Sequence, residues 1–167
     1  MTAPSESAAG TRHKTVYSTP SERELVVVRT FDAPRSIVWS AFTDPKHVPH
    51  WHTGPDGFTM PRCEIDLRPG GSFHYGWRNA HGREFDATGT YREVDPPNRL
   101  VTVTNRDGEE NCNTTTFTEE NGRTTVTVSL LFASQASRDK GIPYTKIGTD
   151  TNYARLDDYL ATERTKR

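Results

Sequence analysis

The spacing of apolar residues along the chain predicts a strand followed by two short helices at the start of the ordered region. The segment "RELVVVRTF" (23–31) is a run of β-branched residues, which favours a strand. In "DAPRSIVWSAFTD", which follows it, apolar residues recur at helical spacing between Ile37 and Phe42. Pro45 ends this helix, and a second short helix is expected to finish near Trp51.

Beyond residue 58 the apolar period becomes two, which is typical of strands. In "SFHYGWR" the side chains of Phe73, Tyr75 and Trp77 share one face. Turn signals separate six such segments: "RPGG", "NAHG", "DPPN", "RDGE" and "ENGR". Pro61 lies inside the first of them, so that strand must be an edge or contain a bulge. The pattern predicts an antiparallel meander.

The period returns to helical near the C-terminus, where one long helix is expected. Its apolar stripe comprises Tyr144, Ile147, Thr151, Tyr153 or Ala154, Leu156, Tyr159 and Leu160. A curved antiparallel sheet of six to seven strands with this helix over its concave face would bury both apolar surfaces. The sequence therefore predicts an α+β helix-grip fold with two short helices, and such a fold tends to leave a cavity under the helix.

The two ends of the chain differ in composition. Residues 1–22 are rich in Ser, Thr, Ala and Pro and show little apolar periodicity, so we expect a disordered leader. An arm docked through Val16 and Tyr17 is the alternative. Residues 23–167 form one domain by length.

Charge and cysteine content exclude several classes of protein. The 167 residues carry 21 Lys and Arg against 22 Asp and Glu, a net charge of −1, so no nucleic-acid partner is expected. No apolar run reaches the length of a membrane span. Cys63 and Cys112 lack metal-site or redox spacing, which is typical of free thiols in the cytoplasm. No cofactor is predicted.

Three histidines, His47, His50 and His52, fall within "KHVPHWHTGP" and raise the question of a metal site. His47 and His50 can share a helical face, but His52 leaves from another side, and metal ligands must converge. We therefore predict no metal. His47 and His50 are expected to face water, and His52 to lie at the mouth of the cavity.

Several segments together resemble the SRPBCC (START-like, helix-grip) superfamily, and more narrowly the family of homologues of the activator of the heat-shock protein 90 ATPase. They are "VVVRTFDAPRSIVWSAFTDPKHVPHW", "CEIDLRPGGSFHY", "YREVDPPNRLV" and "RLDDYL". The resemblance implies the same order of elements and a deep cavity for an apolar or amphipathic ligand. It also allows a homodimer.

The chain departs from the family pattern at positions where bulky apolar residues are usual. His52 stands where a second aromatic commonly follows Trp51, and Thr102 and Thr104 stand where the fifth strand often carries aromatics. Thr149 follows Gly148 where a tryptophan is usual. If these positions face inward, the cavity is roomier and more polar than is typical.

Strand parity and the resemblance give a set of candidate ligand-binding residues. They are Trp51, His52, Phe58, Met60, Arg62, Phe73, Tyr75, Trp77, Phe85, Tyr91, Thr102, Thr104, Tyr153 and Leu156. Binding of a small hydrophobic or amphipathic molecule without chemistry is the first hypothesis.

Two alternatives remain beside it. A cyclase or hydrolase would need an acid–base pair in the cavity, for which His52, Arg62, Glu64, Tyr75 and Tyr91 are the candidates, although Arg62 and Glu64 could instead neutralise each other. A chaperone co-regulator is the other; against it, only a short leader is expected before the domain. No catalytic residue is assigned.

Overall fold

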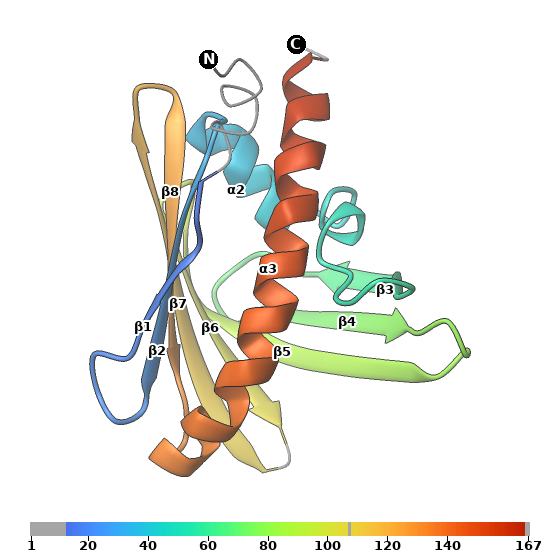
Figure 1. The fold of residues 1–167 in the computed structure, drawn as a ribbon, viewed down its shortest axis with the longest axis vertical. Helices are drawn as coiled ribbons and strands as arrows, with labels where there is room; N and C mark the ends of the chain where they lie inside the picture. The colour runs from blue at the N-terminus through green and yellow to red at the C-terminus, as the bar shows by residue number, and fades with distance from the viewer. Residues whose placement is uncertain (1–12, 107, 166–167) are drawn as a thin grey trace, which may run out of the picture.

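The computed structural model describes residues 13–106 and 108–165 as eight strands, two α-helices and one short 3-10 helix (Figure 1). In chain order they are β1 (Val16–Ser18), β2 (Glu24–Phe31), α2 (Arg35–Thr43), η1 (Val48–His50), β3 (Thr59–Ile65), β4 (Ser72–Arg78), β5 (Glu84–Asp95), β6 (Arg99–Arg106), β7 (Glu109–Glu120), β8 (Arg123–Leu131) and α3 (Gln135–Thr165).

All eight strands belong to one antiparallel sheet in the order β1-β2-β8-β7-β6-β5-β4-β3. The sheet is curved, and α3 runs across its concave face, with α2 and the η1 segment near the C-terminal end of the helix (Figure 1). The predicted α+β helix-grip fold is confirmed. No helix in the part of the chain that the structure describes is both long and apolar enough to cross a membrane.

The structure adds one strand, β1, to the seven that were predicted. This strand lies within the segment 1–22, for which we predicted disorder. Val16–Ser18 pairs with Val26–Val28 of β2, which matches the docked-arm alternative, whereas we had expected disorder up to residue 22. Three residues are too short a run to show an alternating pattern in the sequence. Residues 1–12 of the expected leader lie outside the described residues.

Local signals in the sequence place two irregularities correctly. Pro61 lies in β3, which is an edge strand, and the register shifts between Thr59 and Arg62. At the other end of the meander, Asn121 and Gly122 both have positive φ angles, 55° and 75°, in the tight turn between β7 and β8.

The C-terminal helix is longer than predicted and turns a different face to the sheet in its first half. It starts at Gln135 and continues through Pro143. Tyr144 and Ile147, expected in the buried stripe, are 76% and 63% exposed. The stripe prediction is therefore wrong for these two residues, although it holds farther along for Leu156.

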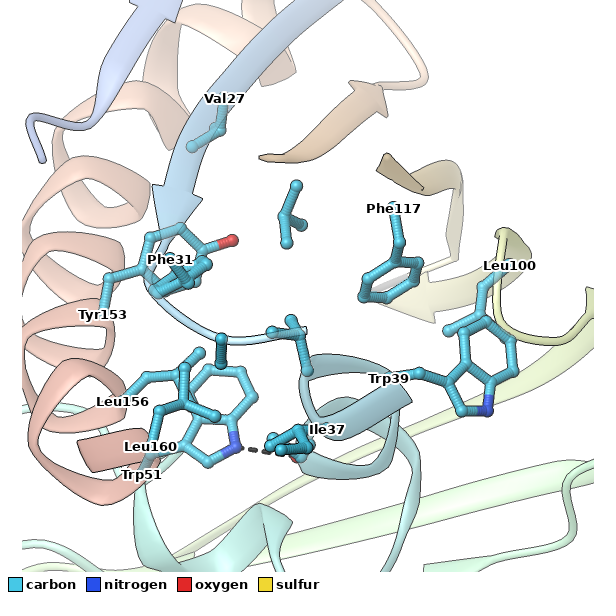
Figure 2. Close-up of a cluster of buried hydrophobic side chains, with 14 of the residues drawn as sticks. Val27, Phe31, Ile37, Trp39, Trp51, Leu100, Phe117, Tyr153, Leu156 and Leu160 are labelled. Atoms are coloured by element: carbon cyan, nitrogen blue, oxygen red, sulfur yellow. Dashed lines mark hydrogen bonds between the residues drawn. The ribbon is translucent and has the colours of Figure 1, made fainter. Parts of the chain in front are cut away.

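A hydrophobic core lies at the end of the sheet where α2, the η1 segment and the second half of α3 meet (Figure 2). Phe117 of β7 packs edge-on against Trp39 and Phe42 of α2, with ring centroids 5.2 and 5.3 Å apart. Phe31 of β2 meets Tyr153 of α3 in the same way at 5.1 Å. These contacts fix both helices on the concave face.

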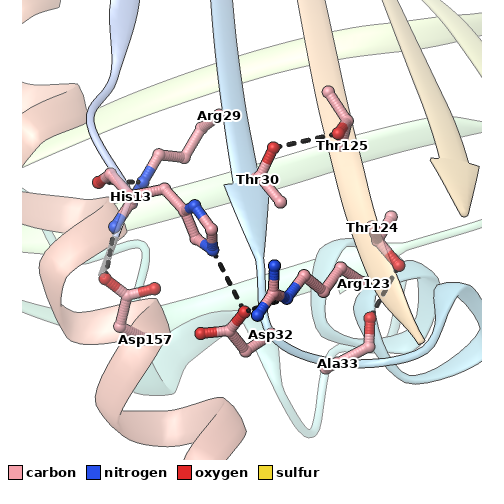
Figure 3. A network of polar contacts seen from close by, with 9 residues as sticks. All are labelled: His13, Arg29, Thr30, Asp32, Ala33, Arg123, Thr124, Thr125 and Asp157. Carbon is pink, nitrogen blue, oxygen red and sulfur yellow. Dashed lines mark hydrogen bonds and ion pairs between the residues drawn. The ribbon is translucent and has the colours of Figure 1, made fainter. Parts of the chain in front are cut away.

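A polar network supports the same end of α3 from the β2 side (Figure 3). The guanidinium of Arg29, which is only 4% exposed, donates hydrogen bonds to Asp157 of α3 and to the backbone oxygen of His13. Removing one partner of such a buried pair would leave an uncompensated charge. Nearby, Asp32 binds both His13 and Arg123.

Truncation of Phe117 tests whether this core holds the helices. We expect Phe117→Ala to lower the free energy of unfolding by about 3–5 kcal/mol, because it deletes a fully buried ring. The exposed neighbour Thr118→Ala serves as the control and should change stability by less than about 0.5 kcal/mol. Urea denaturation measures both; equal effects of the two changes would contradict the assignment.

Candidate ligand-binding cavity

A partly open chamber of about 320 Å³ lies between α3, the segment after η1 and strands β4 to β8. We call it the inner chamber. Aromatic residues form much of its wall: Phe42, Trp51, Phe73, Tyr75, Trp77, Tyr91 and Tyr153. From α3, the residues that face it besides Tyr153 are Thr149 and Asn152. The middle of the helix thus presents small polar side chains to the chamber.

A second hollow of about 670 Å³ adjoins it, and we call this the outer chamber. The two chambers share His52, Thr104, Asn113, Thr149 and Tyr153 among their walls. Besides His52 and Tyr153, the polar residues of the outer chamber are Thr88, Thr104, Asn105, Asn111, Asn113, Thr145 and Thr149, with Asp86. The inner chamber is therefore the more aromatic end of a continuous space, and the outer chamber is the more polar end.

The outer chamber lies where the sheet divides. Pairing between β5 and β6 extends from Asp95 only as far as Gly89, opposite Thr104. Residues 84–88 of β5 continue on β4 alone, whereas β6 continues on β7. The edges that separate here carry wall residues of the outer chamber, so the division gives a route between the cavity and solvent.

Gly89 lets the Phe73 ring, which lines the inner chamber, lie against the backbone of β5. It is paired with Phe73 across β4 and β5. A Cβ atom at this position would lie 2.4 Å from Cζ of Phe73, so the ring lies directly over the β5 backbone.

The loop that follows η1 is held over the cavity from two sides. The indole N–H of Trp77 donates to the backbone oxygen of His52 at 2.8 Å. On the helix side, the amide of Gly54 donates to the Asn152 side chain at 2.8 Å. Arg155 donates to the Gly54 oxygen and to Asp56. His52 is thereby fixed in the wall that both chambers share.

Burial sets the protonation of His52. Its ring stacks on Trp51 at 5.2 Å and meets the edges of Tyr75 and Trp77 at 5.4 and 5.7 Å. Loss of solvation lowers the pKa of His52 to about 4. The imidazole is therefore neutral at neutral pH.

The tyrosines of the inner chamber are also neutral. Burial raises the pKa of Tyr91 to about 12 and raises those of Tyr75 and Tyr153 well above the usual range. The aromatic wall thus offers hydroxyl groups and no charge.

Most of the predicted site residues meet in this space. Nine of them line the inner chamber: Trp51, His52, Phe73, Tyr75, Trp77, Tyr91, Thr102, Thr104 and Tyr153. Thr149, noted as a departure from the family pattern, lines both chambers. Thr102, Thr104 and Thr149 face inward, which was the condition for a roomier and more polar cavity.

The other five predicted residues do not line the inner chamber. Phe58 and Phe85 stack on each other at 5.8 Å beyond the chamber. Arg62 pairs with Glu64 in solvent at 2.9 Å, as the neutralised-pair alternative proposed. Met60 is buried outside the chamber walls, and Leu156 is part of the core.

The walls that β7, β8 and α2 contribute were not predicted from the sequence. These are Phe42, Asn113, Thr115, Val128 and Leu130, together with Ala87, Leu100 and Asn152. The segment "NCNTTTFTE" has few apolar residues, so its alternation does not indicate which face is concave. Only its register with β6, which places Asn113 opposite Thr102, reveals the face.

His47 and His50, the other two histidines of the segment "KHVPHWHTGP", contact Tyr159 of α3 and line neither chamber. The ring of His50 stacks on Tyr159 at 4.8 Å, and Nδ1 of His47 is hydrogen-bonded to the Tyr159 hydroxyl. His50 is exposed as expected, but His47 is half-buried, because it lies against the helix. Among the residues that the structure describes, no group of three His, Cys, Asp or Glu side chains is arranged to hold a metal.

Most of the chain matches a known protein family. The model of the family "Activator of Hsp90 ATPase homolog 1-like protein" matches residues 32–161. The chain belongs to this family. A search of curated proteins finds no match.

Solved structures agree with the fold. A Rhodobacter sphaeroides protein is 26% identical, with a TM-score of 0.84, and the match covers 89% of this chain and 99% of that one. A Nitrosomonas europaea protein is 21% identical, with a TM-score of 0.79 over 88% and 99%. An AHSA1-like protein from Aeromonas hydrophila is 24% identical, with a TM-score of 0.65 over 80% and 93%. The family and its helix-grip fold are of the ligand-binding type.

The depressed pKa of His52 makes a testable contribution to stability. The unfolded chain binds a proton at this residue below about pH 6.5, whereas the folded protein does so only near pH 4. The contribution is therefore complete above pH 6.5 and falls by about 1.4 kcal/mol per unit as the pH decreases. Between pH 7 and 4.5 we expect a loss of about 2–3 kcal/mol from this group.

His52→Phe removes the titrating group and keeps an aromatic ring. Urea denaturation at the two pH values should show a smaller loss of stability for His52→Phe than for the wild type, by that amount. His81→Gln, in the exposed β4–β5 turn, is the control and should follow the wild type. An identical pH dependence for His52→Phe and the wild type would show that the surroundings of His52 do not lower its pKa.

Proposed function

We propose that the protein binds a small hydrophobic or amphipathic molecule in the cavity between the sheet and α3. The observation that carries the proposal is the aromatic inner chamber, which α3 does not fill because it presents Thr149 and Asn152 there. Aromatic walls with a few polar groups are typical of small-molecule sites, and about 320 Å³ is within the volume that such sites have.

The energetics support binding of a small aromatic ligand. Burial of roughly 200 Å² of apolar ligand surface is worth about 5 kcal/mol at ~25 cal/mol per Å². The walls are held in place before a ligand arrives, since Trp77, Asn152 and Arg155 already fix the loop around His52. A preformed site avoids much of the cost of ordering side chains on binding.

The same geometry favours binding over catalysis. Arg62 and Glu64, two of the acid–base candidates, pair with each other in solvent. Burial also weakens the cavity candidates, because it lowers the pKa of His52, which becomes a weaker base, and raises that of Tyr75, which becomes a weaker acid. The nearby Cys63 thiol has its pKa raised to about 11, so little of the nucleophilic thiolate is present at neutral pH.

Filling the chamber tests the proposal. The fluorescent amine N-phenyl-1-naphthylamine is uncharged and has a size that the inner chamber can hold. We expect saturable binding to the wild type and at least a tenfold weaker affinity in Thr104→Trp, because the new indole occupies space that both chambers share. Fluorescence titration gives the dissociation constants.

Thr90→Trp is the matched control, because Thr90 is exposed on β5 and lines neither chamber. This variant should bind the probe as the wild type does, and circular dichroism should show that both variants are folded. Equal affinity in Thr104→Trp and the wild type would contradict the proposed site.

A further inference from the structure

Four polar side chains form two facing pairs on the concave side of the sheet. Thr102 of β6 lies opposite Asn113 of β7, and Thr104 lies opposite Asn111. We call these four residues the polar ladder. Thr102 lines the inner chamber and Asn111 the outer one, while Thr104 and Asn113 line both. The polar ladder therefore extends along the path from one chamber to the other.

The polar ladder occupies positions where the fold calls for apolar residues. On the same face, farther along the same two strands, Leu100 and Phe117 are buried in the core. The concave face of a sheet under a helix is normally apolar. Packing thus does not account for the polar residues of the ladder.

The hydrogen-bonding capacity of the polar ladder is not used within the described chain. Oδ1 of Asn111 is buried and has no hydrogen-bond partner there. The side chains of Thr102, Thr104 and Asn113 make no hydrogen bond to any described residue. A buried acceptor without a partner is unfavourable, and a ligand that carries a donor would satisfy it.

The surroundings of the polar ladder carry no positive charge for an acidic ligand. Of the described residues that line the two chambers, none is Lys or Arg, and Asp86 is the one acidic residue. His52 is neutral there. Arg29, on the same face of the sheet, is paired with Asp157. Lys140 lines an adjoining hollow, but Glu109 lines that hollow too.

We propose that the polar ladder is the subsite for the polar part of the ligand, and that it selects an uncharged molecule with amide or hydroxyl groups over an anionic one. This inference rests on the proposed function, because it assigns the ligand chemistry of the same cavity. Asparagine and threonine side chains both donate and accept hydrogen bonds, which suits such groups. A carboxylate would lose its hydration without gaining a cation.

A pair of isosteric compounds tests the selection. 2-Naphthamide and 2-naphthoate have the same shape and differ in one group, an amide against a carboxylate. Each competes at pH 7 with bound N-phenyl-1-naphthylamine. We expect 2-naphthamide to displace the probe at a concentration at least tenfold lower than 2-naphthoate does.

Two variants test whether the polar ladder is responsible. The double change Thr102→Val with Asn113→Leu removes one facing pair and should bring the preference for the amide below threefold, while the probe itself still binds. Thr104→Lys places a cation in the ladder and should shift the preference toward 2-naphthoate. Thr114→Val is the control: Thr114 adjoins Asn113 on β7 but lines neither chamber, so the preference should stay at the wild-type value.

The outcomes separate this inference from the proposed function. If the probe binds in the cavity but the two naphthalene compounds compete equally, or the acid competes better, the selection by the polar ladder is wrong and the binding site remains. The same conclusion follows if the preference is unchanged in the double variant. If the probe does not bind saturably, the proposed function fails and the ladder subsite fails with it.

Discussion

The attachment of α3 at one end is the constraint on which the cavity depends. Tyr153, Leu156 and Leu160 lie in the second half of the helix, and they pack with Phe31 and Trp51 into one core. The Arg29–Asp157 ion pair holds the same half. In the first half, Thr145 and Thr149 face a sheet that curves away, and their side chains are too small to reach across. The helix is thus well packed against the curved sheet at one end and leaves a chamber toward the other.

Contacts at the middle and at the N-terminal end of α3 keep this geometry without filling the chamber. The hydroxyl of Tyr17, in β1, donates to Asp150 at 2.6 Å, and Arg138 donates to the backbone oxygen of Ser21 at 2.6 Å. Ser137 donates to Glu109 at the start of β7. These are polar contacts at the margins of the helix. The helix is therefore fixed at both ends while the space beneath its first half stays open, which is a sound basis for a preformed site.

Strand alternation was sufficient to predict the part of the cavity that β4 and β5 provide. Phe73, Tyr75 and Trp77 repeat with period two, so their common face was visible in the sequence, and the structure places all three in the inner chamber. Where the alternation is weak, the prediction failed. The polar residues of β7 gave no indication of which side is concave. On α3, apolar spacing suggested that Tyr144 and Ile147 are buried, but the helix has little apolar surface to cover in its first half, and both are exposed. The general fold follows from the pattern, whereas the shape of the cavity follows from register and curvature.

The central claim is that a small molecule enters the chambers under α3, and backbone NMR of the protein with N-phenyl-1-naphthylamine tests it most directly. Amide chemical-shift changes on titration identify the residues that the probe contacts. The account predicts saturable changes concentrated at Thr102, Thr104, Asn113 and Thr149, which line the inner chamber on three elements. Changes concentrated at Tyr144 and Ile147, on the exposed face of α3, or no saturable change at all, would contradict it.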